Sequence, residues 1–203
     1  MASETNVLAV SKASEKGFER GFKSSWCENT AAGVRKRMGL EPTDVLSPYE
    51  LAKHLGITVW TPEEVPGLNP NVMGYLCSSR GDEWSAVTIK ILGKQIIIVN
   101  SRHSAARKSS DVMHELAHIL RGHKPAQVFI QDGFALRDFD DLQENEANWF
   151  AGCLLLPRVA LSTATYNGLG ATEIAEEYGV STSLTNYRLN KTGVRRQFSN
   201  LRR

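Results

Sequence analysis

The chain has no run of about 18 uncharged apolar residues, which is the length that a membrane-spanning helix requires. Its first 16 residues carry two acids and two lysines where a signal peptide would have an apolar centre. We therefore expect a cytoplasmic protein that makes no use of a membrane.

Cysteine is scarce as well. The three cysteines, Cys27, Cys77 and Cys153, are odd in number, lie far apart and form no CxxC pair. This pattern argues against a disulfide framework and against a zinc site built from thiolates. We expect the cysteines to be reduced and mostly buried.

The net charge of +2 is too small to indicate nucleic-acid binding, but acids are missing from one region. No Asp or Glu follows Glu177, whereas residues 184–203 carry six cations. Residues 172–189 have the pattern of a helix, a turn at Gly179 and a second helix capped by Ser181, which is the form of a helix-turn-helix. We favour a hairpin that packs on the rest of the protein, and a weak nucleic-acid contact through this basic tail is the alternative.

The remaining sequence predicts an α+β fold. With 41% hydrophobic residues in 203, the chain is long enough to bury one core. Helical periodicity and stop signals predict helices over residues 17–38, 47–55, 102–121 and 140–155. Between the second and third helices, β-branched and apolar runs predict a β-meander with strands over residues 57–60, 72–77, 84–92 and 95–99.

The third predicted helix contains the sequence His-Glu-Leu-Ala-His at 114–118. Histidines four residues apart differ by about 40° around a helix, so His114 and His118 can bind one ion from the same side. Glu115 lies near enough to reach a water on that ion. Zinc lowers the pKa of a bound water and polarises a carbonyl, and an adjacent carboxylate can take the proton and deliver it to a leaving amine. The pattern therefore predicts hydrolysis without a nucleophilic side chain.

Catalytic zinc sites of this type need a carboxylate as third ligand, and the next helix offers two. Glu144 shares a helical stripe with Asn148, and small residues flank that stripe, so we favour Glu144 as the ligand. We expect the Asn148 side chain to hold a histidine N–H or the ligand carboxylate by a hydrogen bond. Glu146 points about 160° away around the helix, and we interpret it as a solvated first-turn acid. We interpret His123, which follows the helix end, as a partner of the helix dipole.

These residues resemble the ImmA/IrrE-type zinc metallopeptidases. The second motif of that family has the form E-x-x-A-N/D-x-F-A-x-x-L-L-x-P, and the chain matches it at Glu144, Ala147, Asn148, Phe150, Ala151, Leu154, Leu155 and Pro157. The resemblance extends over roughly residues 25–196. Ser110 and Met113 depart from the residues that family members often have ahead of the first motif.

The resemblance implies a thermolysin-like core, a zinc ion held by His114, His118 and Glu144, and Glu115 as the general base. It also implies a protein substrate, since members of the family cleave partner repressors. We therefore expect a zinc endopeptidase that cleaves a helix-turn-helix repressor. The alternative is a non-catalytic regulatory protein that binds DNA or a partner and has a structural or degenerate metal site.

Two further expectations concern the layout of the chain. We expect a flexible lead-in over residues 1–16, a zincin-like metallopeptidase domain over 17–160 and a basic helix-turn-helix-like extension over 161–203. The run Ile97-Ile98-Val99 directly precedes the metal-binding helix. We expect these residues to bind substrate as an added strand along residues 95–99, provided that this strand lies at the edge of the sheet.

Overall fold

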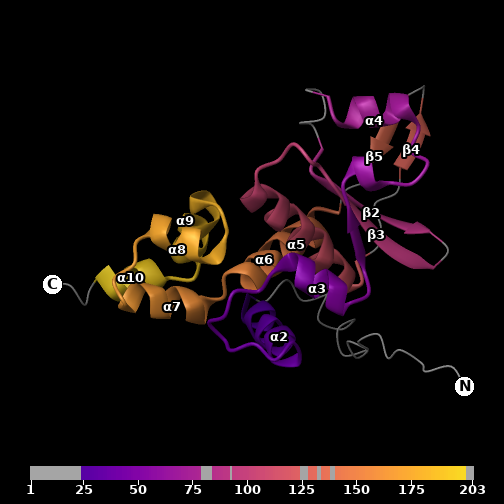
Figure 1. Cartoon of the computed structure of the whole chain (residues 1–203). Helices are drawn as coiled ribbons and strands as arrows, with labels where there is room; N and C mark the ends of the chain where they lie inside the picture. Colours follow the sequence, from indigo (N-terminus) through magenta and orange to yellow (C-terminus); the bar gives the residue numbers. More distant parts are fainter. Residues whose placement is uncertain are drawn as a thin grey trace, which may run out of the picture.

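A computed structural model describes residues 24–78, 84–91, 93–123, 128–131, 134–137 and 140–199. Two helices in the centre of Figure 1, α5 (Ala105–Arg121) and α6 (Asp141–Leu155), pack against each other, with a small sheet on one side and a helical C-terminal part on the other. The fold is therefore α+β, as the sequence predicts. The expected lead-in and the first residues of the first expected helix lie outside the described residues.

The helices that precede the sheet support α6 and α5. α2 (Ser24–Arg37) buries Cys27, Ala31 and Val34, and its Trp26 ring lies 5.7 Å from the ring of Phe150 on α6. α3 (Pro48–His54) begins with Ser47, whose side chain accepts a hydrogen bond from the Glu50 N–H, as expected for a cap followed by proline. Together these helices form one wall of the core.

Both central helices begin and end on signals in the sequence. Ser104 caps α5, and Gly122 ends it with a φ of 65°, a backbone conformation that glycine adopts without strain. Asp140 caps α6 by accepting hydrogen bonds from the N–H groups of Leu142 and Gln143. α6 ends one residue before the Leu156-Pro157 pair, since proline cannot continue a helix.

The sheet has the strand order β1-β3-β2, formed by β1 (Thr58–Trp60), β3 (Lys94–Val99) and β2 (Ala86–Ile91). β3 pairs in parallel with β1 and in antiparallel with β2. The sheet is therefore mixed, and β3 is its central strand. Ile97 and Val99 of β3 are fully or almost fully buried.

Two details of the predicted meander are wrong. The segment expected as a strand over residues 72–77 is a helix, α4 (Pro70–Leu76), because Asn69 accepts a hydrogen bond from the Asn71 N–H and Pro70 occupies the first helical turn. β1 runs parallel to β3, which a meander does not allow. The short 3-10 helix η2 (Pro62–Glu64) lies in the connection between β1 and α4.

The connection between α5 and α6, expected as a loop, includes an antiparallel hairpin of β4 (Val128–Gln131) and β5 (Phe134–Arg137). In Figure 1 this hairpin lies beside α4, above the sheet. No helix among the described residues is both long and apolar enough to span a membrane.

The C-terminal part consists of α7 (Arg158–Tyr166), α8 (Ala171–Tyr178), α9 (Thr182–Lys191) and α10 (Val194–Ser199). These helices lie together next to α6 in Figure 1. The boundary expected between residues 160 and 161 falls inside α7, because Pro157 sets the start of that helix. The division into two units stays a prediction.

Candidate metal centre

Three side chains from α5 and α6 converge where the two helices cross. The Nε2 atoms of His114 and His118 lie 3.0 Å apart. The carboxylate of Glu144 approaches both, with 3.2 Å from Oε2 to Nε2 of His114 and 3.4 Å from Oε1 to Nε2 of His118. Among the described residues these three form the group of histidine, cysteine and acid side chains that is able to hold a metal ion.

The donor atoms fit a tetrahedral metal. Ligand atoms about 2.0–2.1 Å from a zinc ion in tetrahedral geometry lie roughly 3.3 Å apart, which agrees with the observed spacings. The side chains of His114, His118 and Glu144 are 23%, 20% and 31% exposed, so solvent and a ligand can reach the cluster. Two imidazoles and one carboxylate with an accessible side are typical of a catalytic site rather than a closed structural one.

Glu115, next to His114 on α5, extends toward the sheet. Its Oε2 accepts a hydrogen bond of 2.5 Å from Oγ1 of Thr88 on β2. Thr88 pairs in register with Ile97, whose side chain is buried, and both residues therefore face α5. This contact holds a carboxylate between the metal ligands and the sheet.

A comparison with family profiles agrees with this geometry. The profile of the IrrE N-terminal-like domain, Peptidase_M78, matches residues 78–190, which is more than half of the chain. The chain belongs to the Peptidase_M78 family. No curated protein matches the chain significantly.

Membership in Peptidase_M78 means that the convergence of His114, His118 and Glu144 lies in a metallopeptidase fold. A metal ion and a protein substrate are what this family implies. The matched residues run from just after α4 to the last turn of α9, so they include α5 and α6, which carry the cluster, and most of the C-terminal part.

The electrostatic surroundings favour neutral histidine in the M78 site. Burial and, to a lesser degree, the neighbouring His114 lower the pKa of His118 from 6.5 to about 4, although Glu144 opposes this shift. A neutral imidazole is the form that binds a metal. His118 is therefore ready to bind at neutral pH.

Sequence reasoning was wrong about Glu146. Its side chain is 9% exposed, and its two oxygens bind Nη2 of Arg121 at 2.7 Å and Nε2 of His123 at 3.1 Å. Burial by itself raises the pKa of Glu146, but the hydrogen bonds from His123 and Arg121 outweigh it and keep the pKa below its ordinary value. Glu146 is thus a buried, ion-paired acid and not a solvated one, because Arg121 at the end of α5 and His123 just beyond it contact its carboxylate.

The role of His123 was also missed. Its Nδ1 lies 3.0 Å from Nδ1 of His118, so it contacts the atom on the far side of the ring from the metal cluster. The available signal was the glycine stop directly before it, which turns the chain back over the last turn of the helix.

Asn148, expected to support a ligand, is exposed on α6. Among the described residues the structure gives it no hydrogen bond to His114, His118 or Glu144, and His123 occupies the position beside His118. That Asn148 supports a metal ligand by a hydrogen bond stays a prediction.

The expected addition of substrate to residues 95–99 is wrong. Both edges of β3 are paired, with β1 on one side and β2 on the other, so no backbone groups are available for another strand. Ile97 and Val99 are buried in the core and Ile98 is half-buried, which leaves these side chains as packing residues. The continuous apolar run reflects a central strand covered by helices.

The C-terminal helices have the form of a helix-turn-helix, but its second helix, α9, exposes Lys191 and buries its other cation, Arg188. Arg188 of α9 is fully buried and binds Glu28 of α2 at 2.6 Å and the Leu156 carbonyl oxygen at 3.1 Å. The exposed side of α8 carries acids, namely Glu173, Glu176 and Glu177. The favoured interpretation of residues 172–189 as a hairpin packed on the peptidase fold agrees with these contacts.

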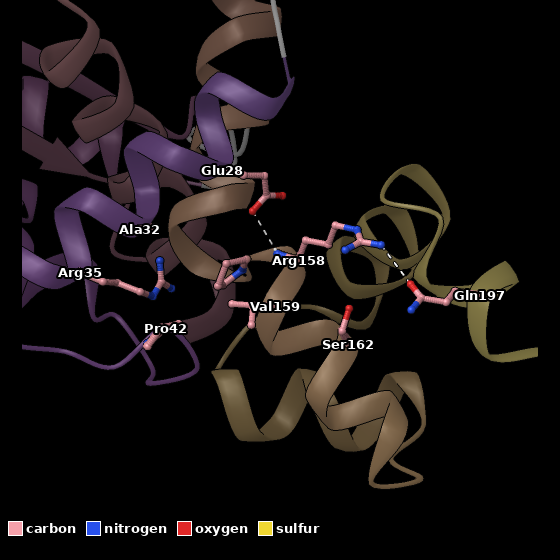
Figure 2. Close-up of a pocket in the computed structure, with 9 residues that line it drawn as sticks. Glu28, Ala32, Arg35, Pro42, Arg158, Val159, Ser162 and Gln197 are labelled. Carbon is pink, nitrogen blue, oxygen red and sulfur yellow. Dashed lines mark hydrogen bonds between the residues drawn. The ribbon is translucent and has the colours of Figure 1, made fainter. Parts of the chain in front are cut away.

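A cavity of about 450 Å³ lies away from the metal cluster, between α2, α7 and α10 (Figure 2). At its rim the Arg158 N–H donates to Oε2 of Glu28, and the Arg158 guanidinium donates to Oε1 of Gln197. Arg35 lines the cavity, and its guanidinium donates hydrogen bonds to the carbonyl oxygens of Cys153 and Leu154. These contacts join the C-terminal helices to α2 and α6 and are structural.

Proposed function

We propose that this chain is a zinc-dependent endopeptidase that cleaves a specific protein partner, a transcriptional repressor. The observation that carries the proposal is the convergence of His114, His118 and Glu144 beside Glu115, on two packed helices of a Peptidase_M78 fold. This set combines a three-ligand metal site with an acid that is not itself a ligand.

Metal binding and proton transfer are assigned to different residues of the cluster. His114, His118 and Glu144 would hold the metal. A zinc ion bound there would lower the pKa of a water to about 7 and polarise the carbonyl of the scissile bond. Glu115 takes the proton from the attacking water and delivers it to the leaving amine, and Thr88 orients its carboxylate through the 2.5 Å hydrogen bond.

The substrate strand is proposed to add to β2 instead of β3. β2 pairs with β3 alone among the described strands, so its other edge can accept an extended peptide. The contact between Thr88 of β2 and Glu115 supports this position, because it places the edge strand beside the catalytic acid. Main-chain hydrogen bonds to an edge strand give affinity with little sequence demand, and specificity then comes from docking elsewhere.

A helix-turn-helix repressor as substrate follows from the resemblance of the motifs to repressor-cleaving members of the family. A cytoplasmic location is proposed on the same grounds. A helix-turn-helix repressor encoded next to the gene of this chain would be the candidate substrate.

The test compares Glu115→Gln with Glu144→Gln. We expect Glu115→Gln to retain one zinc per chain and the wild-type circular dichroism spectrum, but to lose at least about 100-fold in cleavage, because an amide cannot accept the proton. Glu144→Gln is expected to lose zinc as well as cleavage. Zinc content is measured after dialysis, and cleavage of the purified repressor is followed on gels.

Glu176→Gln is the control, because Glu176 is an exposed acid on α8, far along the chain from the cluster. It should cleave like the wild type. Unchanged cleavage by Glu115→Gln would reject the peptidase mechanism, and retention of zinc by Glu144→Gln would reject Glu144 as third ligand.

A further inference from the structure

A chain of four side chains leads away from the metal cluster into the interior. Nδ1 of His118 lies 3.0 Å from Nδ1 of His123. Nε2 of His123 lies 3.1 Å from Oε2 of Glu146, and the other oxygen of Glu146 lies 2.7 Å from Nη2 of Arg121. The side chains of His123, Glu146 and Arg121 are 3%, 9% and 8% exposed, so water does not compete for these contacts.

The end of α5 explains why His123 meets His118. The His123 N–H donates to the His118 carbonyl oxygen at 3.0 Å, and the Gly122 N–H donates to the Ile119 carbonyl oxygen at 3.0 Å. This pair of hydrogen bonds is a Schellman motif, in which the residue after the glycine contacts the residue five positions earlier. The helix stop thus places one imidazole against the other.

The hydrogen-bonding capacity of each group sets the direction of the chain. The Glu146 carboxylate accepts only, and Arg121 already donates to one of its oxygens. His123 must therefore carry its proton on Nε2 to donate to the other oxygen. A neutral imidazole has one N–H, so Nδ1 of His123 is an acceptor and His118 must donate from its own Nδ1.

Nε2 of His118 is then without a proton, and this is the atom that faces His114 and Glu144. We propose that Glu146, acting through His123, is a positioning residue that holds His118 in the tautomer able to bind the metal. Arg121 keeps the Glu146 carboxylate in the orientation that this requires. The role of zinc rests on the proposed function, whereas the tautomer is a property of the chain alone.

The first measurement uses the full chain without metal, treated with chelator and held at pH 8. Long-range ¹H–¹⁵N NMR spectra distinguish a ring nitrogen with a proton from one without, and a His118→Asn variant identifies the His118 signals. We expect His118 with its proton on Nδ1 and His123 with its proton on Nε2. The opposite tautomer of either ring in the wild-type chain would overturn the proposal.

The second measurement uses Glu146→Gln. Arg121 would donate to the amide oxygen, so the amide NH₂ would face His123 and donate to its Nε2. His123 would then donate from Nδ1, and the His118 proton would move to Nε2, where it opposes metal binding. We expect the His118 tautomer to reverse and the zinc affinity, measured by competition with a chromogenic chelator, to fall about 10- to 100-fold.

Asp141→Asn is the matched control, since it removes one carboxylate charge from the same helix at an exposed position. It should leave both the tautomer and the zinc affinity unchanged. If Glu146→Gln leaves both unchanged too, the proposal is wrong. If Asp141→Asn lowers zinc affinity as much as Glu146→Gln, the effect is one of charge and the proposal is also wrong.

These outcomes are separate from those of the proposed function. A chain with the expected tautomers that never binds zinc or cleaves protein refutes the peptidase and leaves the tautomer assignment in place. A chain that cleaves its repressor but shows His118 with its proton on Nε2 refutes the positioning role alone.

Discussion

Replacing Arg188 by methionine tests how the C-terminal helices are attached to the peptidase fold. Arg188 is fully buried on α9, and its guanidinium donates to Glu28 at 2.6 Å and to the Leu156 carbonyl oxygen at 3.1 Å. The guanidinium also lies 5.1 Å from the centre of the Trp149 ring. Gly152 makes room for it, because a Cβ there would lie 3.0 Å from Cδ of Arg188.

The size of the effect follows from what the substitution leaves behind. Methionine fills a similar volume but donates nothing, so the Glu28 carboxylate and the Leu156 carbonyl oxygen each lose a partner. Breaking a buried ion pair from one side costs about 3–5 kcal/mol. The Glu28 side chain is 23% exposed and still accepts a hydrogen bond from the Arg158 N–H, so we expect the lower end of that range, about 3 kcal/mol.

Urea unfolding, followed by tryptophan fluorescence and circular dichroism, measures the free energy of unfolding of the wild type and the variant. The control is Arg195→Met, because Arg195 is exposed and its guanidinium donates to Oδ1 of Asn186 in a solvent-exposed hydrogen bond. It should change the free energy of unfolding by no more than about 0.5 kcal/mol. Equal stability of Arg188→Met and Arg195→Met would refute the assignment of Arg188 to the core and would reopen a role in nucleic-acid binding.

Two further predictions concern titratable groups in the core. Cys27 and Cys153 are buried, and burial raises the pKa of Cys27 to about 12 and also raises that of Cys153. A thiol reagent should therefore label Cys77 alone in the native chain and all three cysteines in urea. Labelling of three thiols at equal rates in the native chain would contradict this. In chelator-treated protein, burial and the nearby His114 lower the pKa of His118 to about 4. Above pH 6.5 neither the folded nor the unfolded chain binds this proton, whereas between pH 6.5 and 4 only the unfolded chain does. The free energy of unfolding should therefore fall as the pH is lowered from 6.5 to 4. The fall should be less steep in His118→Gln.

Much of the metal centre could be predicted because its geometry is local. The spacing of His114 and His118 sets their common side on any helix, and helix phase distinguishes Glu144 from Glu146 without knowledge of the partner helix. The cap at Ser104 and the stop at Gly122 define the helix that carries the motif. These are short-range effects of backbone geometry, which the order of residues determines directly.

Errors arose where a local pattern fits two structures. Residues 72–77 have a composition that is compatible with a strand, but the cap at Asn69 and the proline at Pro70 start a helix there. The isoleucine run of β3 suits either an edge or a central strand, and the choice depends on β1, which lies more than 30 residues earlier in the chain. Strand pairing is a long-range event, so periodicity within one segment does not settle it.

The sequence by itself determined the α+β class, the two helices that carry the candidate metal ligands and the side of each helix on which those residues lie, because hydrophobic period, caps and residue spacing act within a few turns. Only the tertiary structure decided which charged side chains are buried. Glu146 and Arg188 have the composition of surface residues, yet both are buried by elements remote in sequence. Burying a charged side chain is favourable only when an oppositely charged or hydrogen-bonding partner is buried with it. The packing of the helices brings Arg121 and His123 to Glu146, and Glu28 to Arg188.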